Sequence, residues 1–415
     1  LSVEMGDFYL IIIDCLRQDY SEDMFPEMEH SDQAVSNFAK SLPSHNALLT
    51  EKKAEEVGTL GAQGKVETDT IATAFSQEGF RTVSVSTNGF FQPNFGFDDF
   101  EEHHDFENSV PFNQERFEEI RHEHGGFRDS AKQLVKESFE NPTLLLDGLV
   151  YMHKTRMPKI LRDSGLKKTL KVMDTDENDE DHFFAVNLME LHTPRAPPWS
   201  WCLLNGYADL PLRDLYVKLR YGRNPNTVRA ESEEKFHRRA YKAARDYTHE
   251  KMKKWKEEKI SENDVLVITS DHGELLGECG LISHCYGCAP EQFHVPFFYS
   301  GDIEFRDFVS LDDVYDVLVE KIRSGENEET KDQAYFYSEE NSDIENIWAE
   351  NQKGYISTEF RQVDFEESGR KFYRPFKNQE VEDREPVEIP DVERKENYDP
   401  DEEVKERLEK LGYIQ

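Results

Sequence analysis

A short apolar run at Val265–Ile268 leads into a cluster of polar residues, and this junction limits the folds open to the chain. Continuous apolar runs of this length are typical of strands covered on both faces of a parallel sheet. Asp271 and His272 stand side by side a few residues later, where such a strand would end. In open α/β sheets, ligands bind at the carboxyl ends of the strands. Carboxylate oxygen and imidazole nitrogen are common metal ligands, so this junction suits a divalent metal.

Two further apolar runs end in a similar way. Phe8–Ile13 leads straight into Asp14, and Phe183–Met189 is followed by His192 just before a proline. A shorter run, Thr82–Ser86, adds another strand. Taken singly, the aspartate also fits a helix cap and the histidine a loop position. Together, and in this chain order, the runs predict an α/β fold with a central, mostly parallel sheet and one polar edge.

Ser41 precedes a predicted helix start. Pro43 and Ser44 come just before an apolar helical segment, a pattern typical of a helix amino end. The free N–H groups and the dipole of that end favour an anion. A hydroxyl just outside the helix is therefore placed to attack a phosphate or sulfate ester. The alternative is that the two serines are only helix caps.

The charge balance narrows the possible partners. The 415 residues carry 86 acidic and 50 basic side chains, for a net charge of −36. Nucleic acids and anionic membranes bind positive surfaces, so we expect neither as a partner. Such an acidic surface also suits a halophilic protein, because at about 1 M salt the Debye length is about 3 Å and self-repulsion is screened. Without an apolar run of about 18 residues or a signal-peptide pattern, we expect a cytoplasmic protein.

The five cysteines are consistent with reduced thiols rather than a disulfide framework, because their number is odd. Cys285 and Cys288 have the spacing of a zinc-binding pair, and Cys279 and His284 are near enough in sequence to join them. A structural zinc site is therefore an alternative for this segment.

The pattern along the chain predicts two domains. Residues 1–330 are expected to form the catalytic α/β domain, with a charged helical insertion at 113–175. Residues 331–415 are expected to form a small C-terminal α+β subdomain with short antiparallel strands and a final helix at 402–412. The aromatic loop at Phe90–Phe100 is expected to shape the pocket, together with the insertion.

Several motifs together resemble the sulfatase family of the alkaline phosphatase superfamily. They extend from the first predicted strand to the last predicted helix, so the resemblance covers nearly the whole chain. The block Ser-Asp271-His272-Gly-Glu274 is the most specific of them. The others are Ile-Ile-Ile-Asp14-Cys-Leu-Arg17, Ser41-Leu-Pro-Ser-His45, His192-Thr-Pro194, Gly277-Glu-Cys-Gly280 and Leu408-Glu-Lys-Leu-Gly412-Tyr413.

The resemblance implies an alkaline-phosphatase-like three-layer sandwich and one divalent metal, usually calcium. Asp14, Asp271 and His272 match the metal-binding positions of the family. Ser41 matches the nucleophile, which also touches the metal.

Further matching residues are implied to contact the ester. His192 matches a histidine that holds the sulfate oxygens, and His284 falls near a lysine that contacts the leaving oxygen. His45 matches the arginine of the family signature. Arg17 would add local positive charge, which a strongly acidic chain needs in order to attract an anionic ester.

Two residues depart from the family pattern. Cys15 stands where many sulfatases have a second aspartate, which removes one oxygen ligand and brings manganese or magnesium into consideration beside calcium. Sulfatases convert the Cys or Ser of their signature to formylglycine, and His45 in place of the signature's arginine leaves open whether Ser41 is converted.

These residues predict a sulfate-ester hydrolase acting on a sulfated sugar or another small anionic ester. One alternative is a phosphodiesterase or a phospho-group transferase that uses unmodified Ser41. Another is a catalytically silent binding module of the same fold. Neither the substrate nor the oligomeric state follows from the sequence.

Overall fold

The computed structural model describes residues 6–57, 65–106, 164–174, 181–193, 195, 197–210, 231–284, 289–326, 331–338, 352–382 and 384–391. Its contacts divide the chain into two compact units. The first consists of Leu1–Glu107, Ser164–Arg195 and Asn226–Gln415, and the second of Asn108–Asp163 and Ala196–Pro225. In the second unit, helix α7 (Trp199–Leu204) is followed by a turn in which Tyr207 stacks on Trp201. Both large sheets and all of the candidate site residues belong to the first unit.

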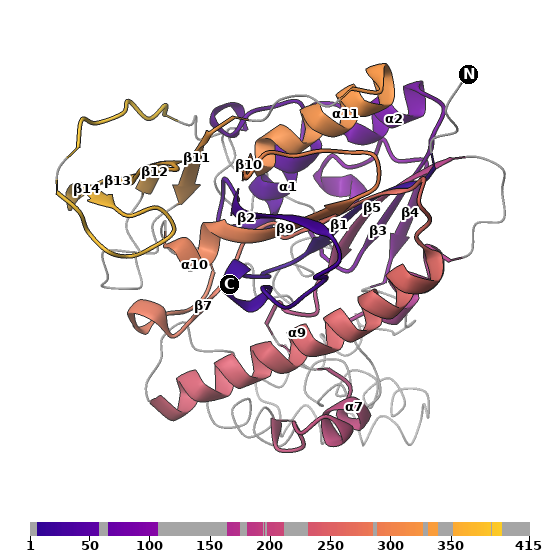
Figure 1. Cartoon of the computed structure of the whole chain (residues 1–415), viewed down its shortest axis with the longest axis horizontal. Coiled ribbons are helices and arrows are strands. Elements are labelled where there is room, and N and C mark those ends of the chain that lie inside the picture. The colour runs from indigo at the N-terminus through magenta and orange to yellow at the C-terminus, as the bar shows by residue number, and fades with distance from the viewer. Residues whose placement is uncertain are drawn as a thin grey trace, which may run out of the picture. The chain divides into compact units, whose positions relative to one another are not determined.

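An eight-stranded sheet forms the centre of the first unit, with the strands in the order β10-β2-β9-β6-β1-β5-β3-β4 (Figure 1). Strand β9 is antiparallel to both of its neighbours, and the other neighbouring pairs are parallel. The strands are β1 (Phe8–Ile13), β2 (Glu29–Val35), β3 (Arg81–Ser86), β4 (Glu102–Asp105), β5 (His182–Leu188), β6 (Val265–Thr269), β9 (His294–Ser300) and β10 (Phe308–Ser310).

The three apolar runs of the sequence lie side by side in this sheet, because β1 pairs with β5 on one side and with β6 on the other. Every residue of these three strands is buried. Ile13 pairs with Leu188 and Ile12 with Thr269, so the strands end at the same edge. The polar residues that follow each strand therefore meet, as expected for the carboxyl edge of a parallel sheet.

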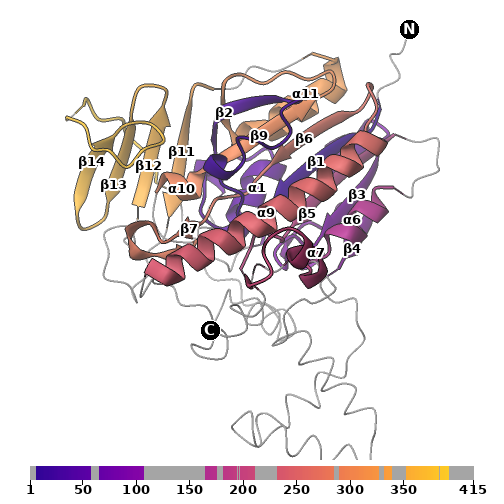
Figure 2. The ribbon, with the colours of Figure 1, turned by 60° about the horizontal axis from the view of Figure 1, so that its bottom comes forward.

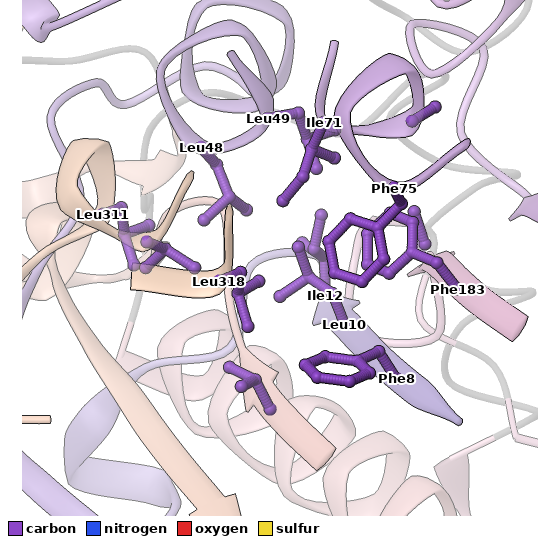
Figure 3. Close-up of a cluster of buried hydrophobic side chains, with 14 of the residues drawn as sticks. Phe8, Leu10, Ile12, Leu48, Leu49, Ile71, Phe75, Phe183, Leu311 and Leu318 are labelled. Atoms are coloured by element: carbon purple, nitrogen blue, oxygen red, sulfur yellow. The ribbon is translucent and has the colours of Figure 1, made fainter. Parts of the chain in front are cut away.

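Helices cover both faces of the sheet, which explains why its central strands are apolar throughout. On one face lie α1 (Ser41–Leu49), α2 (Ile71–Gln77) and α11 (Val314–Ser324). Figure 3 shows the core on this face, in which alternate residues of β1 meet the helices; the labelled members are Phe8, Leu10, Ile12, Leu48, Leu49, Ile71, Phe75, Phe183, Leu311 and Leu318.

The long helix α9 (Glu231–Lys259) runs along the other face of the sheet (Figure 2). Its Trp255 packs edge-on against Tyr9 of β1, with ring centroids 5.4 Å apart. Helix α6 (Leu166–Val172) lies against β3 and α9. Helix layer, sheet and helix layer together confirm the predicted three-layer α/β fold with a mostly parallel sheet.

A second, antiparallel sheet has the order β11-β12-β13-β14. Its strands are Gln333–Ser338, Gln352–Ser357, Arg361–Phe365 and Gly369–Tyr373. Phe336 stacks on Phe293 of α10 (Pro290–Phe293), with centroids 4.5 Å apart, and the buried guanidinium of Arg361 lies over the same ring. The predicted C-terminal antiparallel strands are thus present, whereas a domain boundary at residue 330 stays a prediction. A small hairpin pairs β7 (Leu275–Leu276) with β8 (Ile282–Ser283).

The structure corrects two expectations about the segments around the sheet. Ser41 is the first residue of α1, whereas we expected it just outside the helix. The phenylalanines of the Phe90–Phe100 loop were expected to shape the pocket, but they are buried in the core beside α2. Their size makes this burial favourable, since each large aromatic ring removes much apolar surface from water.

Three segments with sequence predictions fall partly or wholly outside the described residues. They are the Cys285–Cys288 pair, most of the expected insertion at 113–175, and the expected final helix at 402–412. None of the described helices is long and apolar enough to cross a membrane.

Candidate active site

The candidate site lies at the shared carboxyl edge of β6, β1 and β5. Asp14 follows β1 directly, Asp271 and His272 follow β6, and His192 comes four residues after β5. Helix α1 starts at the same edge and presents Ser41 from its first turn. The structure thus brings together residues from four distant segments, all of them buried.

The hydroxyl of Ser41 lies between an aspartate and a histidine. Its Oγ is 3.3 Å from Oδ2 of Asp14 and 3.2 Å from Nε2 of His272. Nδ1 of His272 lies 3.0 Å from the carbonyl oxygen of Gly273, which can only accept a hydrogen bond. The ring proton is therefore on Nδ1, and Nε2 presents a lone pair toward Ser41. Ser41 also lies at a helix amino end, which favours negative charge.

The two aspartates of the site differ in their hydrogen-bond partners. Asp14 accepts hydrogen bonds at Oδ2 from Asn88 Nδ2 at 2.7 Å and at Oδ1 from the Cys15 thiol at 2.9 Å. Asp271 accepts at Oδ1 from the backbone N–H groups of Cys15 and His272. Burial, together with the nearby charge of Asp271, raises the pKa of Asp14 to about 7.

The Oδ2 atom of Asp271 is buried and accepts no hydrogen bond within the described chain. The imidazole nitrogens nearest to it are Nε2 of His45 at 3.6 Å and Nε2 of His272 at 3.5 Å. A buried carboxylate oxygen is costly unless it is paired, and a cation beside Asp14 and Asp271 would satisfy it. The donor set of two carboxylates, a hydroxyl and an imidazole lone pair therefore fits a divalent metal.

His45 lies behind the site rather than beside Ser41. Its Nε2 is 3.0 Å from Nδ2 of Asn187, and its ring packs against Phe91 and Phe97, with centroids 5.4 and 6.3 Å away. Burial lowers the pKa of His45 to about 4, so the ring is neutral at pH 7. These contacts make His45 a support for Asp271, unlike the permanently charged arginine of the family signature.

His192 and His284 form the side of the site with a small exposed area, 7% and 6% of each residue. Their Nε2 atoms are 3.2 Å apart. The ring of His284 also lies 4.4 Å from that of His272, centroid to centroid. Burial and the neighbouring His284 lower the pKa of His192 to about 3. The pair is therefore next to the metal-type ligand His272.

Arg17 is held by acidic partners beside the site. Its guanidinium makes a paired contact with Asp19, and Nη1 bonds Glu278 at 2.9 Å and the Glu274 carbonyl oxygen at 3.0 Å. These bonds hold the pKa of Arg17 above its usual range, although burial opposes the rise. Its contribution to the field of the site is thus largely cancelled by two carboxylates.

Several residues that support the site were not predicted. Arg195 and Glu274 form a buried ion pair, and Thr193 Oγ1 donates to the same carboxylate. This ion pair connects the loop after β5 to the loop after β6. It therefore holds the loop that contains His192 against the loop that contains Asp271 and His272. Asn88, which holds Asp14, follows β3 by two residues. The sequence signal for Asn88 was its place after a strand in the same sheet.

The three-layer fold of this chain is similar to that of sulfatases of known structure. The profile of the sulfatase family matches residues 28–322, which is more than half of the chain. The chain belongs to the sulfatase family, and it is a sulfatase-like hydrolase.

Solved structures of similar fold include sulfatases and a related hydrolase. A protein solved with its substrate D-glucosamine-2-N,6-O-disulfate has a TM-score of 0.59 and 11% identity, over 89% of this chain and 91% of that chain. A phosphonate monoester hydrolase of Agrobacterium radiobacter has a TM-score of 0.58 and 14% sequence identity, over 89% of each chain. A 2-O GAG sulfatase has a TM-score of 0.55 and 13% sequence identity, over 98% of this chain and 90% of that chain. Comparison with curated proteins found no match.

Proposed function

We propose that this chain is a metal-dependent hydrolase of sulfate esters, with Ser41 at the position of the nucleophile. The observation that carries the proposal is the position of the Ser41 hydroxyl at the amino end of α1. Its Oγ is 3.3 Å from Oδ2 of Asp14 and 3.2 Å from Nε2 of His272. A hydroxyl among metal-type ligands is activated in a way that an isolated serine is not.

The ligands of the divalent metal would be Asp14, Ser41, Asp271 and His272. When bound, such an ion polarises the ester oxygens and lowers the pKa of the hydroxyl that it touches. Calcium is the ion that the family suggests, and manganese or magnesium are the alternatives, because Cys15 stands where many sulfatases have a second aspartate ligand. The unpaired Oδ2 of Asp271 supports this assignment.

His192 and His284 are placed to serve the ester itself. They are slightly more exposed than the two aspartates, at 7% and 6% against 0%. Charge that develops on the ester oxygens would be offset by the cation bound beside these two rings. The substrate would be a sulfated sugar or another small anionic ester.

A phosphoester or phosphonate ester is the second candidate substrate class. Two observations favour it: His45 is a neutral, buried ring where the signature has an arginine, and Cys15 replaces an oxygen ligand. Under this alternative Ser41 stays unmodified and attacks phosphorus directly.

Mass spectrometry of the peptide that contains Ser41 separates the two candidates. The sulfatase proposal predicts a mass that corresponds to formylglycine at this position, together with sulfate release from sulfated sugars. An intact serine, with hydrolysis of phosphate or phosphonate esters and no sulfate release, would establish the alternative instead.

A further inference from the structure

We propose that Cys15, His192 and His284 form a second cation site, and that it takes a thiophilic ion of the zinc class. Their three ligand atoms, one sulfur and two nitrogens, all lie within 4.8 Å of one another, and all three residues are buried. The inference holds for either ester class, and it refines the proposed function by giving the two histidines an ion to hold.

Each of the two imidazoles has its Nδ1 beside a backbone carbonyl oxygen. Nδ1 of His192 is 2.7 Å from the carbonyl oxygen of Thr193, and Nδ1 of His284 is 3.3 Å from that of Ala39. Because a carbonyl oxygen can only accept, each Nδ1 carries the ring proton, and each Nε2 is left with its lone pair. This pattern, an imidazole held by its other nitrogen, is typical of metal-binding histidines.

The distance between these two lone-pair nitrogens matches a shared ion. Nε2 of His192 and Nε2 of His284 are 3.2 Å apart. Two lone pairs at this distance repel unless a proton or a cation lies between them. Two nitrogens that bind one tetrahedral zinc at about 2.0–2.1 Å lie about 3.3 Å from each other.

Cys15, whose thiol donates to Asp14 Oδ1 at 2.9 Å, is held in a rare backbone conformation. Its φ of +65° lies in the left-handed region, which costs about 1–3 kcal/mol in a residue other than glycine. Two contacts hold it there: its N–H donates to Asp271 Oδ1 at 3.3 Å, and its carbonyl accepts from the Tyr241 hydroxyl at 2.6 Å. A thiol beside two imidazoles is a soft donor set, which selects zinc over calcium or magnesium.

The two sites differ in their ligands, so separate variants can empty each. Asp14, Asp271 and His272 provide oxygen and nitrogen donors to the first site, which is the metal site described under the proposed function. His192 and His284 belong to the second site alone. Cys15 also lies within reach of Asp14 and His272, so a thiolate bond by itself does not identify the site. A histidine variant is needed beside the cysteine variant.

Cobalt substitution tests the inference directly. The whole chain is stripped of metal and titrated with Co²⁺, in a background with Cys285→Ser and Cys288→Ser so that this thiol pair cannot contribute. We expect the near-ultraviolet absorption band of a Co²⁺–thiolate bond. Cys15→Ser should abolish the band, and His284→Ala should weaken Co²⁺ binding at this site by at least roughly 10-fold.

Two controls complete the design. Cys202→Ser removes another buried free thiol and should keep the band. Asn88→Ala weakens the first site through Asp14 and should also keep it. Absence of the band from the wild-type chain, a band that survives Cys15→Ser, or a band unchanged in His284→Ala would overturn the inference. Because the readout is spectroscopic, failure of the sulfatase proposal would leave this result intact.

Discussion

The hydroxyl of Ser41 lies 3.2 Å from Nε2 of His272. The other ring nitrogen of His272, Nδ1, is held by the carbonyl oxygen of Gly273. This relationship joins the first residue of α1 to the end of β6. It depends on residues that hold Asp14 and Asp271 in place, and these residues can be tested separately.

Asn88→Ala should reduce the affinity of the first site for its metal by roughly 10–100-fold, because Asn88 Nδ2 holds Oδ2 of Asp14. Activity should then recover, at least in part, at high metal concentration. Metal titration with activity as the readout measures both effects. Asn205→Ala, at an exposed asparagine, is the control and should change neither. Equal metal dependence in Asn88→Ala and the wild-type chain would contradict this role.

Arg195→Met should destabilise the chain by about 3–5 kcal/mol, because it leaves the carboxylate of Glu274 buried without its charge partner. The double variant Arg195→Met with Glu274→Gln should regain part of that loss, since no uncompensated charge remains. Urea unfolding measures the three free energies.

The surface pair Lys254–Glu258 provides the matched comparison for that ion pair. Both side chains are mostly exposed, so Lys254→Met should change stability by no more than about 0.5 kcal/mol. If Arg195→Met also loses no more than about 0.5 kcal/mol of unfolding free energy, the buried pair is not needed to hold the two loops.

His237 should make the chain less stable in mild acid. Burial, with the nearby charge of Arg195, lowers the pKa of His237 to about 4, below the usual value of about 6.5. The unfolded chain then binds more protons than the folded chain between these values, so stability falls as the pH drops through this window.

The difference between wild type and His237→Gln isolates this effect. From pH 7 to pH 5 the wild-type chain should lose about 2 kcal/mol more unfolding free energy than the variant. Urea unfolding at both pH values measures the loss. His30→Gln, at an exposed histidine, should behave as the wild type does. Equal losses in the wild type and His237→Gln would refute the assignment.

Salt should stabilise the chain, because its net charge of −36 produces self-repulsion that added ions screen. We expect Tm to rise steadily as KCl increases from about 0.1 M to about 2 M. Sodium sulfate should be avoided in this test, since sulfate strengthens apolar burial in most proteins. A Tm that is constant or falls over this KCl range would contradict the halophilic interpretation.

The sequence predicted the central strands because they are buried on both faces and therefore apolar throughout. The polar residues after β1, β5 and β6 then met where the register of a parallel sheet requires. Strand β2 contains the exposed polar residues Glu29, His30 and Asp32, so no apolar run indicated it. Strands β4 and β10 are too short to produce a pattern.

The supporting contacts of the site were harder to predict than its central residues. Arg195 and Glu274 come from loops almost eighty residues apart, and their pairing depends on the fold rather than on any local pattern. The phenylalanines after β3 were expected to shape the pocket, but they belong to the buried core. Asn88, two residues after that strand, is the member of the segment that contacts Asp14.

Release of sulfate from a sulfated sugar tests the central claim most directly. The rate is measured for the chain as purified, after chelation, after divalent metal is restored, and for Ser41→Ala, with Ser76→Ala on α2 as the control. We predict that chelation abolishes release, that metal restores it, and that Ser41→Ala lowers the rate by at least about 10³-fold while Ser76→Ala does not. Sulfate release that survives both chelation and Ser41→Ala would contradict a metal-dependent hydrolase built around Ser41.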